Sequence, residues 1–365
     1  MPDRSRLTSE ALAGEVTGRP ACVRIAPDGA SIADYLHDES KLSAPGIASL
    51  AVPQTVGELR SALAWHAAQG HAVAVSGART GVAGGAVPEP GSHTVSLSAL
   101  RGVIGVDADA EVPTLTVLAG TSLSELNGYL AEHHPGLVFP VDPTETSASL
   151  GGMVSTNAGG ARSYRFGAMR EWVQRLTIEL ASGRTLRLER GRERAIDGVL
   201  WLADGGTPRR LSIEPIPKPA TKNAVGYGFF ADGDAIDLWI GAEGTLGVVS
   251  EVTVRLQRQR GQRLGSLQFF DRVGQAFAYV SALRAARDLR VTAIEFLDAR
   301  SHELARESGK PAPERVLQLA GSAACSIFTE IGYESDEELG DIAERLESMV
   351  RGAGGDPARS LAGAT

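Results

Sequence analysis

Residues 140–160 read PVDPTETSASLGGMVSTNAGG, a segment in which two glycine pairs flank a run of small polar residues. Similar glycine clusters occur before and after it, VSGARTGVAGGAVP at 75–88 and IGAEGTLGVVSEVTVRL at 240–256. Any one of these clusters alone is explained equally well as a tight turn. Three of them in one chain, each with Ser, Thr or Asn among its glycines, favour an extended ligand that lies along exposed backbone.

A cofactor with a pyrophosphate suits such loops. Residues 76–81 follow an expected strand and offer consecutive backbone amides, a nest that binds phosphate without a side-chain charge. Glycine is needed there because a Cβ atom would hold the phosphate away from the amides. Ser155, Thr156 and Asn157 supply short polar groups for ribityl hydroxyls or a ring edge. The total of 43 glycines in 365 residues, about 12% where ~7% is usual, agrees with this interpretation.

The composition and the remaining motifs exclude other classes. A net charge of −8 argues against a nucleic-acid partner, and no apolar run approaches the ~18 residues of a membrane span. The first 30 residues contain no signal-peptide core, and two distant cysteines form no disulfide framework, so we expect a cytoplasmic protein. Neither Gly-x-Gly-x-x-Gly nor Gly-x-x-x-x-Gly-Lys-[Ser/Thr] occurs, which removes the main support for a Rossmann domain or a P-loop. No His-x-x-x-His or Cys-x-x-Cys pair predicts a metal site.

The pattern along the chain changes near residue 260. Before it, short strands are expected at 72–75, 94–97, 115–118 and 138–141, and a hairpin at 176–188. Residues 241–256 are a glycine cluster that leads into an alternating strand, with Val252, Val254 and Leu256 on one face. Helices are expected after the capping boxes Thr55/Glu58 and Ser122/Glu125, whereas 189–236 is predicted as long loops. Beyond it, strands at 267–270, 291–297 and 324–331 alternate with helices at 273–288 and 335–350. This order predicts a ferredoxin-like α+β domain.

In these segments the sequence resembles the vanillyl-alcohol oxidase superfamily of flavoproteins, with its PCMH-type FAD domain. The likeness is greatest to the group of glycolate oxidase FAD-linked subunits, D-lactate dehydrogenases and D-2-hydroxyglutarate dehydrogenases. DYLHDES at 34–40, AVPQTVGEL at 51–59, the three glycine segments and KNAVGY at 222–227 match in order. LGGMVSTNAGG and GAEGTLGVV are specific in combination.

The resemblance implies an α+β fold with two domains. Residues 1–258 would be the FAD-binding domain, with subdomains at about 1–100 and 101–258, and residues 259–365 a partial cap domain. It also implies FAD-binding residues in three groups. The pyrophosphate would contact Ser76, Gly77, Ala78, Arg79, Thr80 and Gly81; the flavin and ribityl chain would contact Pro140, Asp142, Ser149, Gly152, Ser155, Asn157 and Gly159; Glu243, Gly244 and Val249 would lie near the adenine or the loop that closes on it.

Three departures from the family pattern qualify this expectation. The first loop usually reads Arg-Gly-x-Gly-Thr, but Ser76 and Arg79 stand at the Arg and second Gly positions. We still expect binding, because the amides remain and Arg79 can add a charge contact. No histidine follows the glycines of this loop, which indicates non-covalent FAD. The motif His-x-x-Gly-Asp-Gly-Asn-x-His, which holds a metal and the substrate in relatives, does not occur.

The resemblance implies an FAD-dependent dehydrogenase that oxidises a small D-2-hydroxy acid by hydride transfer to flavin. Electrons would leave to an iron–sulfur protein or another acceptor. Because the late cap motif is missing, a flavin-binding subunit of a multi-chain complex and a truncated fragment without catalysis remain as alternatives. The seven histidines give no catalytic candidate, since His66, His133 and His134 fall in or at the end of helices and are better explained structurally. The catalytic residues, the metal ligands and the particular hydroxy acid are therefore not predicted.

Overall fold

In the computed structural model the described residues are 18–25, 32–203, 208–217, 219, 221, 223–224, 226–259, 261–309 and 313–364. They divide into two compact units. Unit 1 comprises residues up to Phe139, Pro143–Gly159 and Ala168–Gln257. Unit 2 comprises Pro140–Asp142, Gly160–Gly167 and Arg258 onwards. Each unit therefore contains residues from more than one stretch of the chain.

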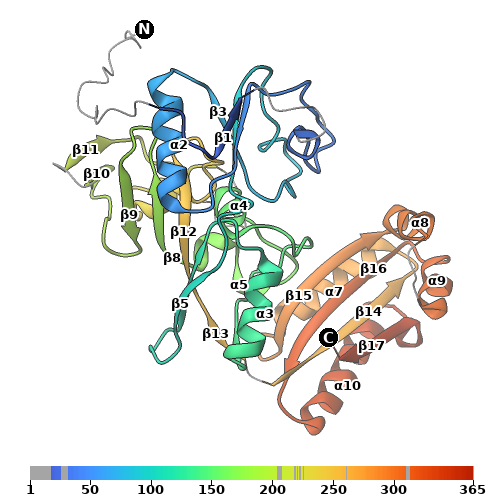
Figure 1. Cartoon of the computed structure of the whole chain (residues 1–365). Coiled ribbons are helices and arrows are strands. Elements are labelled where there is room, and N and C mark those ends of the chain that lie inside the picture. The colour runs from blue at the N-terminus through green and yellow to red at the C-terminus, as the bar shows by residue number, and fades with distance from the viewer. Residues whose placement is uncertain are drawn as a thin grey trace. The chain divides into compact units, whose positions relative to one another are not determined.

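The first sheet of unit 1 has four strands in the order β1-β2-β4-β3. They are β1 (Val23–Ile25), β2 (Ser49–Ala51), β4 (His93–Ser96) and β3 (Val73–Ser76). Strands β2 and β3 both run parallel to β4, so their carboxyl ends share one edge of the sheet and their amino ends share the other. Helix α2 (Val56–Ala68), labelled in Figure 1, is the crossover between β2 and β3. A 3-10 turn, η1 (Ala33–Tyr35), precedes β2.

The second sheet of unit 1 has five antiparallel strands in the order β5-β6-β12-β8-β9. They are β5 (Val103–Asp107), β6 (Thr114–Leu118), β12 (Val248–Arg255), β8 (Val173–Glu179) and β9 (Thr185–Glu189). The central strand β12 comes from the third glycine segment, and its Val252 and Val254 are fully buried. The remaining short elements of this part are α3 (Leu123–His133), β7 (Leu137–Val138), α4 (Leu150–Ser155), η2 (Met169–Glu171), α6 (Ile236–Trp239) and β13 (Gln257–Arg258).

The helix starts follow the sequence with one correction. Ser122 and Glu125 form the expected capping box on α3, in which each side chain bonds the other's backbone amide. At α2 only half of the predicted box forms. Thr55 Oγ1 accepts from the Glu58 amide at 3.1 Å, but the Glu58 carboxylate binds the amide of Gln54 rather than that of Thr55. The helix still ends as expected near Gly70, which has a φ of +69°.

The prediction of loops throughout 189–236 is wrong in part. Strands β10 (Val199–Leu202) and β11 (Arg209–Ser212) pair antiparallel within this segment. Buried and more exposed residues alternate only in β10, whereas β11 is largely exposed, so the pattern is short and the charged surroundings obscure it. Lys222 and Val225 of the KNAVGY motif lie outside the described residues.

Unit 2 contains a four-stranded antiparallel sheet in the order β15-β16-β14-β17. In chain order its main elements are strand, helix, strand, strand, helix and strand, and two short helices lie between the second and third strands (Figure 1). They are β14 (Gln262–Phe270), α7 (Val273–Ala285), β15 (Arg290–Asp298), α8 (Ala299–Glu307), α9 (Glu314–Ala320), β16 (Cys325–Tyr333), α10 (Asp336–Gly352), η3 (Pro357–Arg359) and β17 (Ser360–Ala364). Helix α5 (Ser163–Phe166), which follows the second glycine segment, packs against β15.

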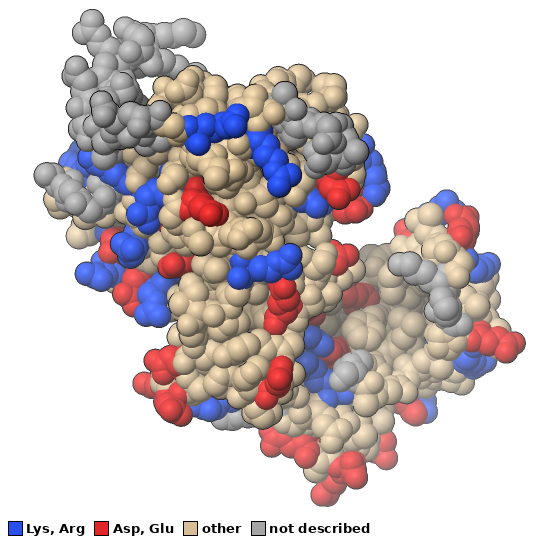
Figure 2. Space-filling model, viewed as in Figure 1, with Lys and Arg blue, Asp and Glu red and all other residues tan. Residues whose placement is uncertain are grey.

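The two long helices of unit 2 cover one apolar core. Tyr279 and Leu283 of α7, and Ile342 and Leu346 of α10, are buried in the same cluster as the side chains of β14 and β16. Ser335 caps α10 by accepting from the Glu338 amide, and three acidic residues occupy the first turn, where carboxylates favour the helix dipole. Figure 2 shows that both units expose charged side chains of both signs. Among the described residues no helix combines the length and the apolar character needed to cross a membrane.

Candidate functional site

The first glycine segment forms a loop with unused hydrogen-bond donors at the carboxyl end of β3. Ser76 ends the strand with its side chain fully buried, and its Oγ has no hydrogen-bond partner among the described residues. Within the described part of the chain, the amides of residues 77–81 also donate to no protein group. Arg79 adopts a left-handed φ of +60°, which turns the backbone within this run. A loop of free amides beside an unpartnered buried hydroxyl fits a phosphate-bearing ligand.

The second glycine segment starts helix α4 beside this loop. Ser149 is the N-cap residue, and its Oγ accepts from the Gly152 amide at 3.3 Å. A Cβ atom built on Gly77 would lie 2.5 Å from Ser149 Oγ, so the first loop passes directly over the start of α4. The other glycine of the pair, Gly151, packs against Ala119, where a Cβ atom would lie 2.7 Å from the alanine side chain. One glycine therefore serves packing and the other lies near the loop.

The third glycine segment meets the first two. The amides of Gly241 and Glu243 donate to the carbonyls of Val154 and Ser155 at 2.9 Å, which fixes the segment to the end of α4. A Cβ atom on Gly244 would lie 3.6 Å from the Val75 side chain in β3, the strand that leads into the first loop. The three glycine segments are thus brought together inside unit 1, as a shared ligand requires.

A buried arginine that the sequence did not predict supports the third segment. The guanidinium of Arg170 donates to the carbonyls of Asp237 at 2.6 Å and Ile240 at 2.5 Å, and it lies 3.4 Å from the Asp237 carboxylate. Its own amide donates to Asn157 Oδ1 at 2.9 Å. Burial lowers the pKa of Arg170, although Asp237 opposes this effect. No sequence motif links Arg170 to the glycine segments, so its role is evident only in the folded structure.

The other predicted site residues are placed as follows. Asn157 is buried with a φ of +48°, and its Oδ1 is already used by Arg170. Ser155 Oγ donates to the Gly151 carbonyl at 2.8 Å. Val249 is buried in β12 opposite Ile178, within the second sheet. Gly159 ends the unit 1 portion of the second segment, whereas Pro140 and Asp142 belong to unit 2.

Asp142 is part of a half-buried ionic cluster in unit 2. Arg162 donates from Nε and Nη2 to the two carboxylate oxygens of Glu330, both at 2.8 Å. Thr292 Oγ1 donates to Glu330 Oε1 at 2.6 Å, and Arg263 Nε lies 3.8 Å from the same oxygen. Asp142 accepts from the Arg162 amide at 3.1 Å. Two arginines, Thr292 and the carboxylate of Asp142 thus gather around Glu330 of β16.

Burial and the neighbouring arginines act in opposite directions on the pKa values of the two carboxyl groups in this cluster. Burial alone would raise the pKa of Glu330, but hydrogen bonds from Arg162 and Thr292 and the charges of both arginines lower it to about 2. Burial raises the pKa of Asp142 despite the nearby arginine. A Cβ atom on Gly160 would lie only 1.8 Å from the Asp142 carbonyl oxygen, so glycine is required there by packing. The sequence indicated Asp142 but gave no sign of its partners in β14, β15 and β16.

Comparison with known proteins agrees with this geometry. Residues 47–189 match the family described as FAD binding domain. The chain is 35% identical over 295 residues to a D-2-hydroxyglutarate dehydrogenase of Xanthomonas citri, covering 80% of this chain and 53% of that protein. It is 30% identical over 277 residues to a D-lactate dehydrogenase of Archaeoglobus fulgidus, covering 76% of this chain and 52% of that protein. The chain therefore spans about half the length of these curated relatives.

These matches define a flavoprotein. The chain belongs to the family that carries the PCMH-type FAD-binding domain, as its glycine segments indicated, and FAD is its cofactor. A solved alkyldihydroxyacetonephosphate synthase has the same fold, with a TM-score of 0.66, 16% identity, and coverage of 96% of this chain and 63% of that one. The orphaned Ser76 hydroxyl and the free amides of residues 77–81 fit the phosphate portion of FAD.

Proposed function

We propose that the chain is an FAD-dependent oxidoreductase that oxidises a small D-2-hydroxy acid by hydride transfer to flavin. The relatives named above act on D-2-hydroxyglutarate and D-lactate, according to their names. The observation that carries the cofactor half of the proposal is the meeting of three glycine segments around unused amides. We propose further that unit 1 is the FAD-binding domain and that residues 258 onwards are the ferredoxin-like part of the cap domain.

Different residues of unit 1 would bind different parts of FAD. The amides of residues 77–81 and the Ser76 hydroxyl would bind the pyrophosphate. Arg79 is held over the Tyr35 ring, with its guanidinium carbon 4.8 Å from the ring centroid, so its charge would act on phosphate from the rim of the loop. Ser149, Gly152, Ser155, Asn157 and Gly159 would follow the ribityl chain and flavin, and Glu243, Gly244 and Val249 would lie toward the adenine.

Binding FAD supplies an acceptor for the hydride that leaves C2 of the hydroxy acid. The contribution of this chain would be orientation and shielding, since it fixes the cofactor through backbone groups that cannot rotate away. For Pro140 and Asp142, a role at the flavin rests on the sequence pattern alone. Because no histidine follows the glycines of the first loop, we propose that FAD is held without a covalent bond. The reduced cofactor then needs an electron acceptor, such as an iron–sulfur protein.

The visible spectrum of the purified chain tests this proposal. We expect flavin bands that precipitation with acid releases into the supernatant, as non-covalent binding requires. Anaerobic addition of D-2-hydroxyglutarate or D-lactate should bleach these bands, while the L isomers should leave them unchanged. Bound flavin that none of the D acids reduces would refute the dehydrogenase activity for this chain and leave the cofactor assignment intact. A chain that binds no FAD would refute the proposal that the three glycine segments bind this cofactor.

A further inference from the structure

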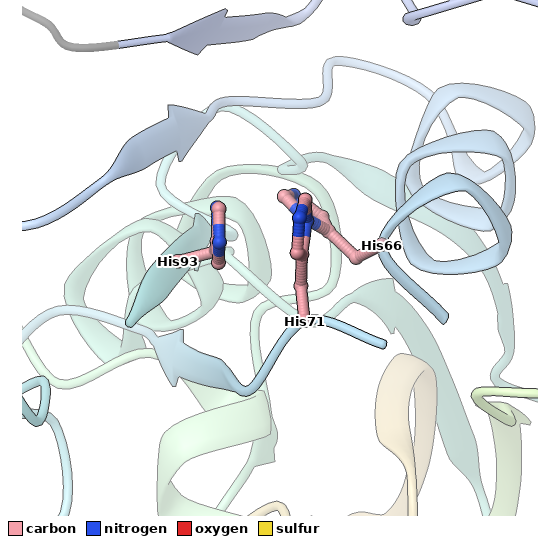
Figure 3. Close-up of side chains that lie close together, drawn as sticks. All are labelled: His66, His71 and His93. Atoms are coloured by element: carbon pink, nitrogen blue, oxygen red, sulfur yellow. The ribbon is translucent and has the colours of Figure 1, made fainter. Parts of the chain in front are cut away.

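Three histidines gather at the edge of the first sheet that is opposite to the FAD loop. His66 lies in the last turn of α2, His71 follows the turn at Gly70, and His93 begins β4 (Figure 3). One imidazole nitrogen from each lies within 4.8 Å of the other two. A helix, a turn and a strand thus place one histidine each around one point.

The backbone holds this arrangement in place. The His71 amide donates to the His66 carbonyl at 3.0 Å through the left-handed turn at Gly70, and the His93 amide donates to the Ala72 carbonyl at 2.9 Å. The Nδ1 atoms of His66 and His71 are 3.1 Å apart. The His71 and His93 rings stack, with centroids 3.8 Å apart. Helix, turn and strand therefore fix all three Cα positions.

The hydrogen bonding of the cluster is incomplete at two of its imidazole nitrogens. His66 is fully buried, and its Nε2 atom has no hydrogen-bond partner among the described residues. In either neutral tautomer one buried nitrogen of this ring, a donor or an acceptor, is therefore unsatisfied. His93 has the opposite arrangement, because its Nδ1 is engaged by Ser49 Oγ at 2.7 Å, which leaves Nε2 available. A hydrogen bond of this kind on one ring nitrogen is what orients a metal-binding histidine.

We propose that His66, His71 and His93 bind a divalent transition-metal ion of the zinc class. Three neutral imidazoles without a carboxylate suit Zn²⁺, Ni²⁺ or Cu²⁺ rather than Mg²⁺ or Ca²⁺. A tetrahedral zinc ion with bonds of about 2.0–2.1 Å separates its ligand atoms by about 3.3 Å. The Nδ1 atoms of His66 and His71, 3.1 Å apart, already match this spacing, and the nitrogen of the partly buried His93, within 4.8 Å of both, needs only a small shift of its ring to complete the set. Solvent would supply the fourth ligand from the side where His71 and His93 are partly exposed.

This site is separate from the FAD loop. The histidines lie at the amino ends of parallel strands, whereas Ser76 ends β3 at the carboxyl edge. The three steps from Val73 to Ser76 span about 10 Å at the rise of a β-strand. The metal would therefore join α2 to β3 and β4 without touching the cofactor, and we expect a stabilising role.

Calorimetric titration of the full chain with ZnCl₂, after removal of metals by chelation, tests the proposal. We expect one ion per chain with a dissociation constant of about 1 µM or lower. H71Q and H93Q should each weaken binding at least about 10-fold, and S49A, which removes the group that positions His93, should weaken it by about 10-fold while all ligands remain. H133Q is the matched control, because His133 is an exposed histidine outside the cluster.

Two further measurements make the result decisive. Circular dichroism in the presence of EDTA tests whether each variant is folded. If a variant is not folded, the X-ray absorption spectrum of the metal-loaded wild-type chain tests the ligands instead. That spectrum should show a first shell of nitrogen and oxygen only, with the multiple scattering of three imidazoles. The proposal is overturned by the absence of stoichiometric binding, by folded H71Q and H93Q variants that bind as tightly as H133Q, or by a shell without three imidazoles.

Discussion

The ion pair at Glu330 allows a quantitative prediction for Glu330→Gln. The side chain is 3% exposed and receives two hydrogen bonds from Arg162 and one from Thr292. These contacts lower its pKa from 4.5 to about 2, and each tenfold change in proton affinity corresponds to about 1.4 kcal/mol. The ionised carboxylate therefore stabilises the fold by about 3 kcal/mol at neutral pH. Glutamine keeps the volume but leaves two half-buried arginines facing Asp142 alone, so we expect a loss of about that size.

The pH dependence has a definite sign. Because folding lowers the pKa of Glu330, its contribution is fully present above pH 4.5 and is lost as the pH falls toward 2. The difference between wild type and Glu330→Gln should therefore shrink to about 1 kcal/mol near pH 3. The matched control is Glu334→Gln, since Glu334 pairs with Arg290 at the exposed end of the same region and should contribute under about 1 kcal/mol.

The assay has to report on unit 2. All four tryptophans, Trp65, Trp172, Trp201 and Trp239, lie in unit 1, so fluorescence is insensitive to the perturbed unit. Amide hydrogen exchange of peptides from β14 and β16 reads the opening free energy of unit 2 directly. We expect exchange roughly 100-fold faster in Glu330→Gln at neutral pH. Equal exchange in Glu330→Gln and Glu334→Gln, or a difference that does not shrink in acid, would refute the reasoning.

Three further predictions concern the FAD loop, the histidine cluster and the cap of α10. Gly77→Ala places a Cβ atom 2.5 Å from Ser149 Oγ and should weaken FAD binding at least about 10-fold in a flavin titration, whereas Gly128→Ala, in open space on α3, should not. Burial and the neighbouring His93 and His71 lower the pKa of His66 to about 4. The metal-free chain should therefore keep its full stability above pH 6.5 and lose about 3 kcal/mol as the pH falls to about 4. A free energy of urea unfolding that does not change over that pH range would contradict this. Ser335→Ala removes the cap of α10 and should lower the free energy of unfolding by about 1 kcal/mol, a loss that the exposed mid-helix substitution Ser281→Ala should not reproduce.

The sequence predicts local structure here better than long-range contacts. Helix starts at Ser122 and Ser335, the hairpin around Gly183 and the strand over Val252 and Val254 were all predictable, because caps, turns and alternation act within a few residues. The hairpin of β10 and β11 was missed because its strands are four residues long and flanked by charge.

The candidate sites show the same limit. Ser76 and Gly77 were found because a phosphate loop is contiguous in sequence. Arg170, Glu330 and the three histidines were not found, since each acts on groups that only folding brings near. His66 and His71 are five residues apart, a spacing that matches no helical ligand pair, and His93 joins them only because β4 lies beside β3. Discontinuous sites of this kind leave no local signal.

The interleaving of the two units has a consequence for synthesis on the ribosome. Residues 160–167 belong to unit 2, yet the partner of Arg162 lies 168 residues further along the chain. At the usual rate of about 5–20 residues per second, Arg162 is exposed for roughly 10–30 s before Glu330 is made. Unit 1 can therefore fold before residues 160–167 have their partners in unit 2. A nascent chain that stalls before β16 would therefore hold Arg162 beside the Asp142 carboxylate but without the two hydrogen bonds to Glu330 that the finished protein has.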